Sequence, residues 1–294
     1  MKSSYRQGVF KVIDDNATNV KEVQHHILDV FRVFNDFCRQ NNLRYYMAWG
    51  TALGAVRHEG FIPWDDDLDV CMPRDDYNKF LATWRNFASN HLKLVSWENE
   101  SEYPYDFAKV YDGRANVVHE VEKKIGRPLP QGIYIDVFPL DYAPNTKVGC
   151  FVFWLYYKVV TSQILYLNGW RSCPTFASRI RYLLGFIISI FPPYKKQNAV
   201  AVYSKLHCSL NKKGSNYYVD FSFVSTFHTF LFQRMKCGVY GSGKEGFFEG
   251  MKVMLPEKVE EYLKASYGDF MVLPDESERI PKHINETEVP WRFL

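Results

Sequence analysis

Apolar residues recur every three or four positions between Asn19 and Asn41, and this pattern predicts an amphipathic helix. Asn19 and Glu22 have the spacing of a capping box at its start. A similar stripe predicts a second helix over residues 75–90. The apolar residues are Val20, Val23, Ile27, Val30, Phe31, Phe34 and Phe37 in the first helix, and Tyr77, Phe80, Leu81, Trp84 and Phe87 in the second.

Short, mostly apolar runs between and after these helices predict strands. Pro73 closes one such run, Leu68–Met72, while Gly50 and Thr51 break another, Leu43–Trp49, ahead of a segment with helical composition. Further predicted strands are Leu92–Trp97, Phe107–Tyr111, Asn116–Val118 and Ile133–Pro139. Strands that alternate with helices indicate an α/β fold with a mixed sheet and flanking helices.

The composition changes at Lys147. Val148–Trp170 and Tyr182–Tyr194 are rich in aromatic and aliphatic residues, but Lys158 interrupts the first, and the second has about half the length that spans a bilayer. Two interpretations stay open: buried helices, or helices in a membrane interface beside basic residues. Those basic residues are Arg171, Arg179, Arg181, Lys195 and Lys196.

Further helices are predicted at Gln197–Leu210 and Pro256–Tyr267, the latter with a proline at its start and Gly268 as its stop. We therefore predict a core over residues 1–146 and a mainly helical half over residues 147–294 that packs on it. Gly241-Ser-Gly-Lys244 lacks the spacing of a P-loop and is predicted to be a turn.

An acidic cluster, Asp65, Asp66, Asp67 and Asp69, precedes and enters the strand at 68–72. Asp67 and Asp69 share one face of that strand, where two adjacent carboxylates repel each other and are costly to desolvate. A hard divalent cation removes this cost. A solvated acidic turn fits the first two aspartates better, and an EF-hand is excluded because Val70 and Asp76 replace its glycine and glutamate.

Other candidate residues lie on neighbouring elements. A strand followed by Gly50-Thr51 and a helix start is an arrangement that binds phosphate, although it is also an ordinary helix cap. Asp136 is a lone carboxylate between aromatic residues in an apolar strand, so it needs either an arginine or a metal as partner. Lys109 could extend from a sheet edge or reach a phosphate. Asp141, beyond Pro139, is predicted to lie in a loop.

The segment WGTALGAVRHEGFIPWDDDLDV resembles the signature of the LicD family, phosphocholine transferases of bacterial surface glycans, and is more distantly similar to fukutin-related sugar-phosphate transferases. The resemblance implies a nucleotidyltransferase-like fold. In this fold Gly50 and Thr51 would hold the donor phosphates, with Lys109 and Arg57 as further candidates. Asp67, Asp69 and a later acid, which the resemblance places at Asp136, would bind Mg²⁺ or Mn²⁺.

The resemblance also implies a reaction. A CDP-activated donor would pass phosphocholine to a sugar hydroxyl of a surface polysaccharide, teichoic acid or lipopolysaccharide precursor, with release of CMP. The sequence does not fix the head group, since ribitol phosphate, glycerol phosphate or phosphoethanolamine would use the same phosphate chemistry. The alternative is a catalytically inactive module for membrane-associated assembly or nucleotide sensing. Such a module would be expected to lose one of the three motif elements, and this chain retains all of them.

Charge and cysteine content bear on location. The net charge of +3 is mild and no dense run of lysine and arginine occurs, so a nucleic-acid partner is not expected. The six cysteines are scattered, which predicts reduced thiols in the cytoplasm. The first residues have no apolar core, so no secretory signal is expected. A lipid-linked glycan acceptor would bring the protein to the inner face of the cytoplasmic membrane.

Overall fold

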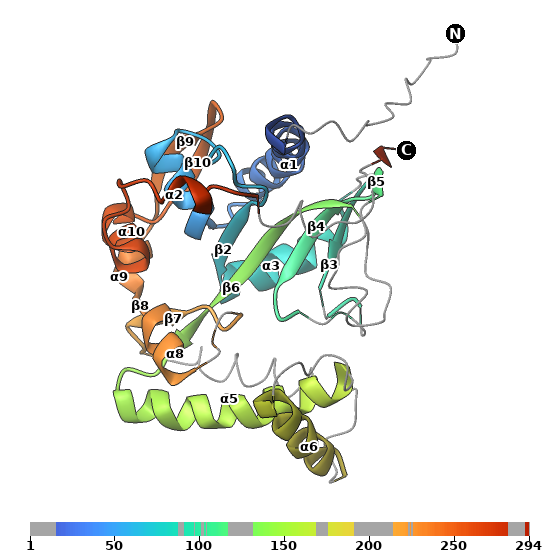
Figure 1. Cartoon of the computed structure of the whole chain (residues 1–294), viewed down its shortest axis with the longest axis vertical. Helices are drawn as coiled ribbons and strands as arrows, with labels where there is room; N and C mark the ends of the chain where they lie inside the picture. Colours follow the sequence, from blue (N-terminus) through green and yellow to red (C-terminus); the bar gives the residue numbers. More distant parts are fainter. Residues whose placement is uncertain are drawn as a thin grey trace.

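The computed structural model describes residues 16–87, 91–96, 98–100, 103, 105–116, 132–168, 176–190, 214–222, 224, 226–281 and 292–293. Its centre is a mixed sheet in the order β1-β2-β6-β4-β3, with β7 pairing with β6 and β8 pairing with β7 (Figure 1). The strands are β1 (Tyr46–Met47), β2 (Asp69–Pro73), β3 (Leu92–Val95), β4 (Ala108–Asp112), β6 (Ile133–Ala143), β7 (Tyr217–Val219) and β8 (Met235–Lys236).

The pairing of β2 with β6 is parallel, and the other described pairs are antiparallel. This confirms the predicted mixed α/β fold. Three helices of the first half flank the sheet: α1 (Asn16–Gln40), α2 (Trp49–Arg57) and α3 (Arg74–Trp84). The apolar stripes of α1 and α3 meet edge to face, for example at Phe34 and Phe80, whose ring centroids are 5.3 Å apart. The two stripes read from the sequence therefore bury each other.

Part of the second half joins this same core. It contributes α9 (Cys237–Tyr240), α10 (Val259–Tyr267) and a hairpin of β9 (Lys244–Phe248) and β10 (Met251–Leu255). Phe248, Val253 and Leu263 are buried with residues of α1, β1 and β2. The first hydrophobic core therefore draws residues from both sides of position 146. Three short elements are β5 (Ala115–Asn116), β11 (Arg292–Phe293) and a 3-10 turn, η2 (Glu276–Glu278).

A second cluster gathers around α5 (Lys147–Asn168), α8 (Phe227–Gln233) and β7, and α6 (Phe176–Ile190) lies against α5 at one end of the molecule (Figure 1). Gly185 allows α6 to approach closely, because a Cβ there would lie 2.0 Å from the carbonyl oxygen of Ser162 on α5. Arg181 fixes the crossing by donating to the Thr161 hydroxyl at 2.7 Å. The predicted helix Gln197–Leu210 lies outside the described residues.

Asp141 lies in a strand, so its predicted loop position is wrong. β6 continues past Pro139, and Asp141 is fully buried, with Arg74 of α3 donating to both carboxylate oxygens at 2.8 and 2.6 Å. The Asp136 N–H donates to the Leu68 carbonyl on the β2 side. The nitrogen of Pro139 must therefore face the opposite side, where β4 pairs only as far as Val137. The proline costs no ladder hydrogen bond there, and the strand continues.

The segment Gly241–Lys244 is confirmed as a turn. Gly241 and Gly243 have φ angles of 53° and 87°, and Lys244 begins β9. Lys109 is not at a sheet edge, because β4 lies between β6 and β3. Its position in the middle of the sheet has consequences for the acidic cluster.

Candidate active site

The acidic residues reach the sheet through a loop, residues 58–68, that other elements hold in place. The Gln24 side chain of α1 donates to the carbonyl oxygens of Ile62 and Asp65 at 3.1 and 2.7 Å. The Phe61 N–H donates to the carboxylate of Glu249 at the tip of the β9–β10 hairpin. Because residues far along the chain fix this loop at several points, it delivers Asp67 and Asp69 to the sheet in a defined position.

The start of α2 is tied directly to Asp69. The Asp69 N–H donates to Thr51 Oγ1 at 2.8 Å, and its carbonyl oxygen accepts from the Ala48 N–H at 3.0 Å. Between them, Trp49 has a φ of 38°, a conformation that costs energy for a residue with a side chain. Its N–H donates to the Tyr262 hydroxyl of α10 at 3.0 Å. These hydrogen bonds join the Gly50-Thr51 start of α2 to β2 in one unit.

Three carboxylates approach one another at this unit. Asp69 and Asp136 are register partners on the parallel strands β2 and β6, so both side chains leave the same face of the sheet. Burial raises the pKa of Asp69 well above its usual value, and the negative charges of Asp67, Asp136 and Asp65 raise it further. The folded protein therefore disfavours ionisation of Asp69, as expected for a buried carboxylate beside other negative charges.

Lys109 is the partner of Asp136 in this structure. It is the register partner of Asp136 on β4, and its Nζ lies 2.6 Å from Asp136 Oδ1 and 3.4 Å from the centroid of the Tyr134 ring. Burial lowers the pKa of this ammonium, while the attraction of Asp136 opposes the shift. The sequence suggested an arginine or a metal as the partner of Asp136, and a sheet edge or a phosphate as the place of Lys109, but it did not foresee this pair.

The donor set suits Mg²⁺ or Mn²⁺ in its chemistry, since Asp67, Asp69 and Asp136 supply oxygen ligands and carry charge that the protein only partly neutralises. Within the described residues, no group of three or more His, Cys, Asp or Glu side chains is arranged to hold an ion by itself. This is compatible with Mg²⁺, which is usually held by one or two carboxylates together with substrate phosphates.

Arg57, at the end of α2, points toward the C-terminal segment. It donates to the carbonyl oxygen of Phe270 at 3.0 Å and to the His58 ring at 3.0 Å. The latter bond needs a neutral imidazole, and burial together with the Arg57 charge lowers the pKa of His58. Its assignment as a phosphate ligand stays a prediction.

The sequence analysis missed two residues near this site. Asp65 places its carboxylate against Gly50, where an added Cβ would lie 2.9 Å from Oδ2. Asp220 follows β7 and is buried, although the stretch Tyr217–Phe221 has the same signal that singled out Asp136, a lone carboxylate between aromatic and apolar residues. That signal was available in the sequence.

Comparisons with known proteins relate part of the chain to a described family. Residues 42–158 match the LicD/FKTN/FKRP nucleotidyltransferase domain. The chain is similar to lipopolysaccharide cholinephosphotransferase LicD of Haemophilus influenzae, with 26% identity over 286 residues, which is 92% of this chain and 98% of the relative. Uncharacterized proteins of Rickettsia prowazekii and Rickettsia typhi are 48% identical over 42 residues, 14% of this chain. The matched domain contains every site residue predicted from the sequence.

Proposed function

We propose that this chain, whose residues 42–158 form a nucleotidyltransferase domain of the LicD family, transfers phosphocholine from CDP-choline to a sugar hydroxyl of a lipopolysaccharide precursor. The observation that carries this proposal is that Thr51, Asp69 and Asp136 meet where β2 begins beside β6. Thr51 accepts the Asp69 N–H, and Asp69 is the register partner of Asp136. The similarity to a lipopolysaccharide cholinephosphotransferase over most of both chains supports the choice of head group and acceptor.

In the proposed reaction the sugar oxygen attacks the phosphorus of phosphocholine, the bond to the bridging oxygen breaks, and CMP leaves with that oxygen. Asp136 accepts the hydroxyl proton, and its ion pair with Lys109 holds the carboxylate in place. Gly50, Thr51 and the Lys109 ammonium would hold the donor phosphates. Asp67, Asp69 and Asp136 would hold Mg²⁺ or Mn²⁺ together with the donor phosphates, and the ion would neutralise charge on the diphosphate.

A panel of donors tests this function. The purified chain is incubated with a lipopolysaccharide acceptor, Mg²⁺ and CDP-choline, CDP-ethanolamine, CDP-ribitol or CDP-glycerol in turn, and CMP is measured. We expect release of CMP from CDP-choline. This release should require the acceptor and should stop when EDTA removes the metal. If no donor yields CMP in the presence of acceptor, the proposed reaction is wrong. If turnover continues in the presence of EDTA, the proposed reaction does not need a metal ion.

We also propose that α5 and α6 contact an anionic membrane surface that carries the acceptor. Thirteen large apolar side chains of these helices are at least 43% exposed, which is an unusual concentration for a surface in water. None of the described helices is long and apolar enough to cross a bilayer. The exposed residues are Val148, Phe151, Val152, Leu155, Tyr156, Val159, Phe176, Ile180, Leu183, Leu184, Phe186, Ile187 and Ile190.

Flotation with vesicles tests this contact. The chain is expected to float with vesicles that contain anionic lipid and to remain below vesicles of neutral lipid, because aromatic rings enter the headgroup region while basic residues attract the lipid charge. Leu183→Asp combined with Ile187→Asp should abolish flotation. Phe247→Asp, on the exposed face of β9, serves as the matched control and should float as before. Of the basic residues predicted to assist, Arg171, Lys195 and Lys196 lie outside the described residues.

If the unmodified chain stays at the bottom of the gradient with every lipid composition, the surface role is wrong. If the α6 double variant floats as well as the unmodified chain, the contact uses another part of the molecule.

A further inference from the structure

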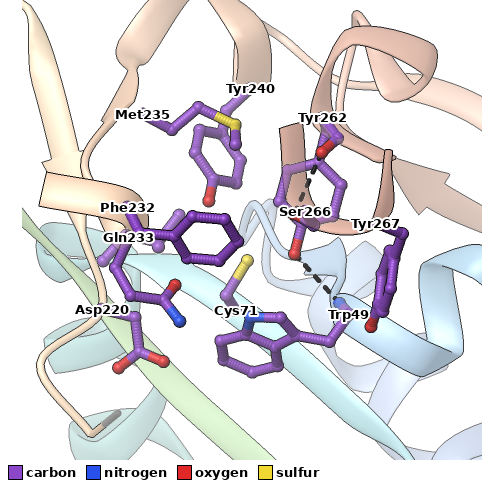
Figure 2. Close-up of a pocket in the computed structure, with 11 residues that line it drawn as sticks. Trp49, Cys71, Asp220, Phe232, Gln233, Met235, Tyr240, Tyr262, Ser266 and Tyr267 are labelled. Carbon is purple, nitrogen blue, oxygen red and sulfur yellow. Dashed lines mark hydrogen bonds between the residues drawn. The ribbon is translucent and has the colours of Figure 1, made fainter. Parts of the chain in front are cut away.

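An aromatic pocket of about 190 Å³ lies beside the acidic cluster (Figure 2). Its volume is below the 300–1,000 Å³ range, in order of magnitude, of pockets for drug-sized ligands, so it fits a small group. The aromatic walls come from α2, α8, α9 and α10. The rings are those of Trp49, Phe232, Tyr240, Tyr262 and Tyr267.

The pocket and the acidic cluster share one face of the sheet. Cys71 lines the pocket and is two residues after Asp69 on β2, so both side chains leave the same face. Leu140 is likewise four residues after Asp136 on β6. Trp49 lies at the boundary, because it lines the pocket and immediately precedes Gly50-Thr51. A donor phosphate held at Gly50-Thr51 would therefore leave a short head group at the mouth of this pocket.

Asp220 supplies a buried carboxyl group to the pocket. It is 3% exposed, its Oδ1 accepts the Ser222 N–H at 3.0 Å, and its Oδ2 is buried with no hydrogen-bond partner among the described residues. Burial raises the pKa of this carboxyl to about 8, and the charges of Asp106 and Asp141 contribute to the shift. A buried carboxylate oxygen without a partner is costly, and a ligand that supplies positive charge would remove the cost.

We propose that the aromatic pocket, with Asp220 in its wall, binds the quaternary ammonium head group of the donor. The assignment rests on the proposed function for the presence of a donor at Gly50-Thr51. A quaternary ammonium cannot donate a conventional hydrogen bond, so proteins recognise it with the faces of aromatic rings and with a nearby negative charge. The pocket offers the rings, and Asp220 supplies the negative charge when a bound cation favours its ionised form.

The shape of the pocket favours such a group over a nucleobase. A flat base is held by rings parallel to it, as in stacking on aromatic side chains. Here neighbouring walls stand at steep angles, since the rings of Tyr240 and Tyr262 are inclined at 60° with centroids 5.7 Å apart. Figure 2 shows the Phe232 ring approaching the Cys71 thiol from the side opposite Tyr267.

Calorimetric titration of the full chain tests the pocket without turnover. The probes are choline and 3,3-dimethyl-1-butanol, which has the same shape and no charge. We expect choline to bind and the neutral analogue to bind at least about tenfold more weakly, because the charge interacts with Asp220 and the rings. Asp220→Asn should reduce choline affinity by about tenfold or more and leave the analogue unchanged. Asp29→Asn, the same change at an exposed site, should alter neither.

Phe232→Leu provides an independent variant, since this ring is 51% exposed and its loss leaves the core intact. It should weaken choline binding by about threefold to thirtyfold, the range for one cation–π contact. Three results would each overturn the proposal. Choline and its neutral analogue could bind equally well, Asp220→Asn could leave choline binding unchanged, or cytidine could compete with choline.

Choline binding should also depend on pH. A cation favours the ionised form of Asp220, so the affinity should rise as the pH increases through about 8, with proton release on binding below that value. Burial raises the pKa values of the neighbouring thiol and phenols, so these groups stay neutral in this range. The titratable or charged groups around Asp220 are Cys71, Asp106, Asp141 with its partner Arg74, Tyr240, Tyr262 and Tyr267. Affinity that is flat between pH 6.5 and 9 would contradict the role of Asp220.

Turnover separates this inference from the proposed function. Asp220→Asn should lower kcat/KM for CDP-choline by about tenfold and leave CDP-glycerol, which has an uncharged head group, unchanged where it serves as a donor. If CDP-choline turnover is unaffected and choline does not bind, the pocket assignment is wrong while the transferase function stands. If no donor releases CMP but choline binds through Asp220, the pocket is a cation site and the transferase function is wrong.

Discussion

Asp69→Asn is expected to lower the rate of CMP release by about a hundredfold or more and to leave the fold intact. Loss of one ligand to the charge-neutralising ion costs several kcal/mol of transition-state stabilisation, and each 1.36 kcal/mol is about tenfold in rate. Asp67→Asn and Asp136→Asn should each have an effect of the same order. The rate is followed with CDP-choline, acceptor and saturating Mg²⁺.

The stability of the Asp69 variant should change in the opposite direction. Burial, with a further contribution from neighbouring carboxylates, raises the pKa of Asp69 in the folded state, so its ionisation opposes folding above its unfolded pKa. Asparagine removes that charge, and the free energy of unfolding at pH 8 should equal or exceed that of the unmodified chain. Asp75→Asn, the same substitution at an exposed position in the first turn of α3, should leave the rate unchanged and lower stability by about 1 kcal/mol or less. A folded Asp69 variant with near-normal turnover would show that this carboxylate is not part of the catalytic machinery.

Arg74→Met is expected to destabilise the fold by about 3–5 kcal/mol, because it leaves the Asp141 carboxylate buried without its partner. The two side chains are 6% and 0% exposed, and their bidentate contact joins α3 to β6. Asp141→Leu should cost a similar amount by leaving the guanidinium unpaired. The double variant Arg74→Met/Asp141→Leu should be more stable than either single variant, since neither charge then remains buried. Urea unfolding measures all three.

The exposed pair Arg32 and Asp29 on α1 is the matched control. Its side chains are 53% and 40% exposed, so solvent screens the attraction, and Arg32→Met should cost about 1 kcal/mol or less. If the single variants at Arg74 and Asp141 lose no more free energy of unfolding than this control, the buried pair does not hold α3 on the sheet.

Much of the local structure could be predicted because its signals are local. The helical spacing from Val20 to Phe37 and the apolar run that ends at Pro73 each depend on a few consecutive residues, and the corresponding helix and strand are present. The turn at Gly241–Lys244 followed from the absence of P-loop spacing. The end of α3 was placed too late, at residue 90 instead of Trp84, because Phe87 still packs on Phe37 after the helix has ended. Packing extended the apolar stripe beyond the helix.

The sequence by itself determined the mixed α/β fold and, for Asp67, Asp69 and Asp136, the need for a partner, since a carboxylate in an apolar strand demands one wherever the strand is placed. Only the tertiary structure decided which partner each one has. Strand order put Lys109 beside Asp136, the continuation of β6 put Asp141 beside Arg74, and the packing of α8–α10 put Asp220 against the aromatic pocket. These choices depend on contacts between residues far apart in the chain, which periodicity and spacing do not encode.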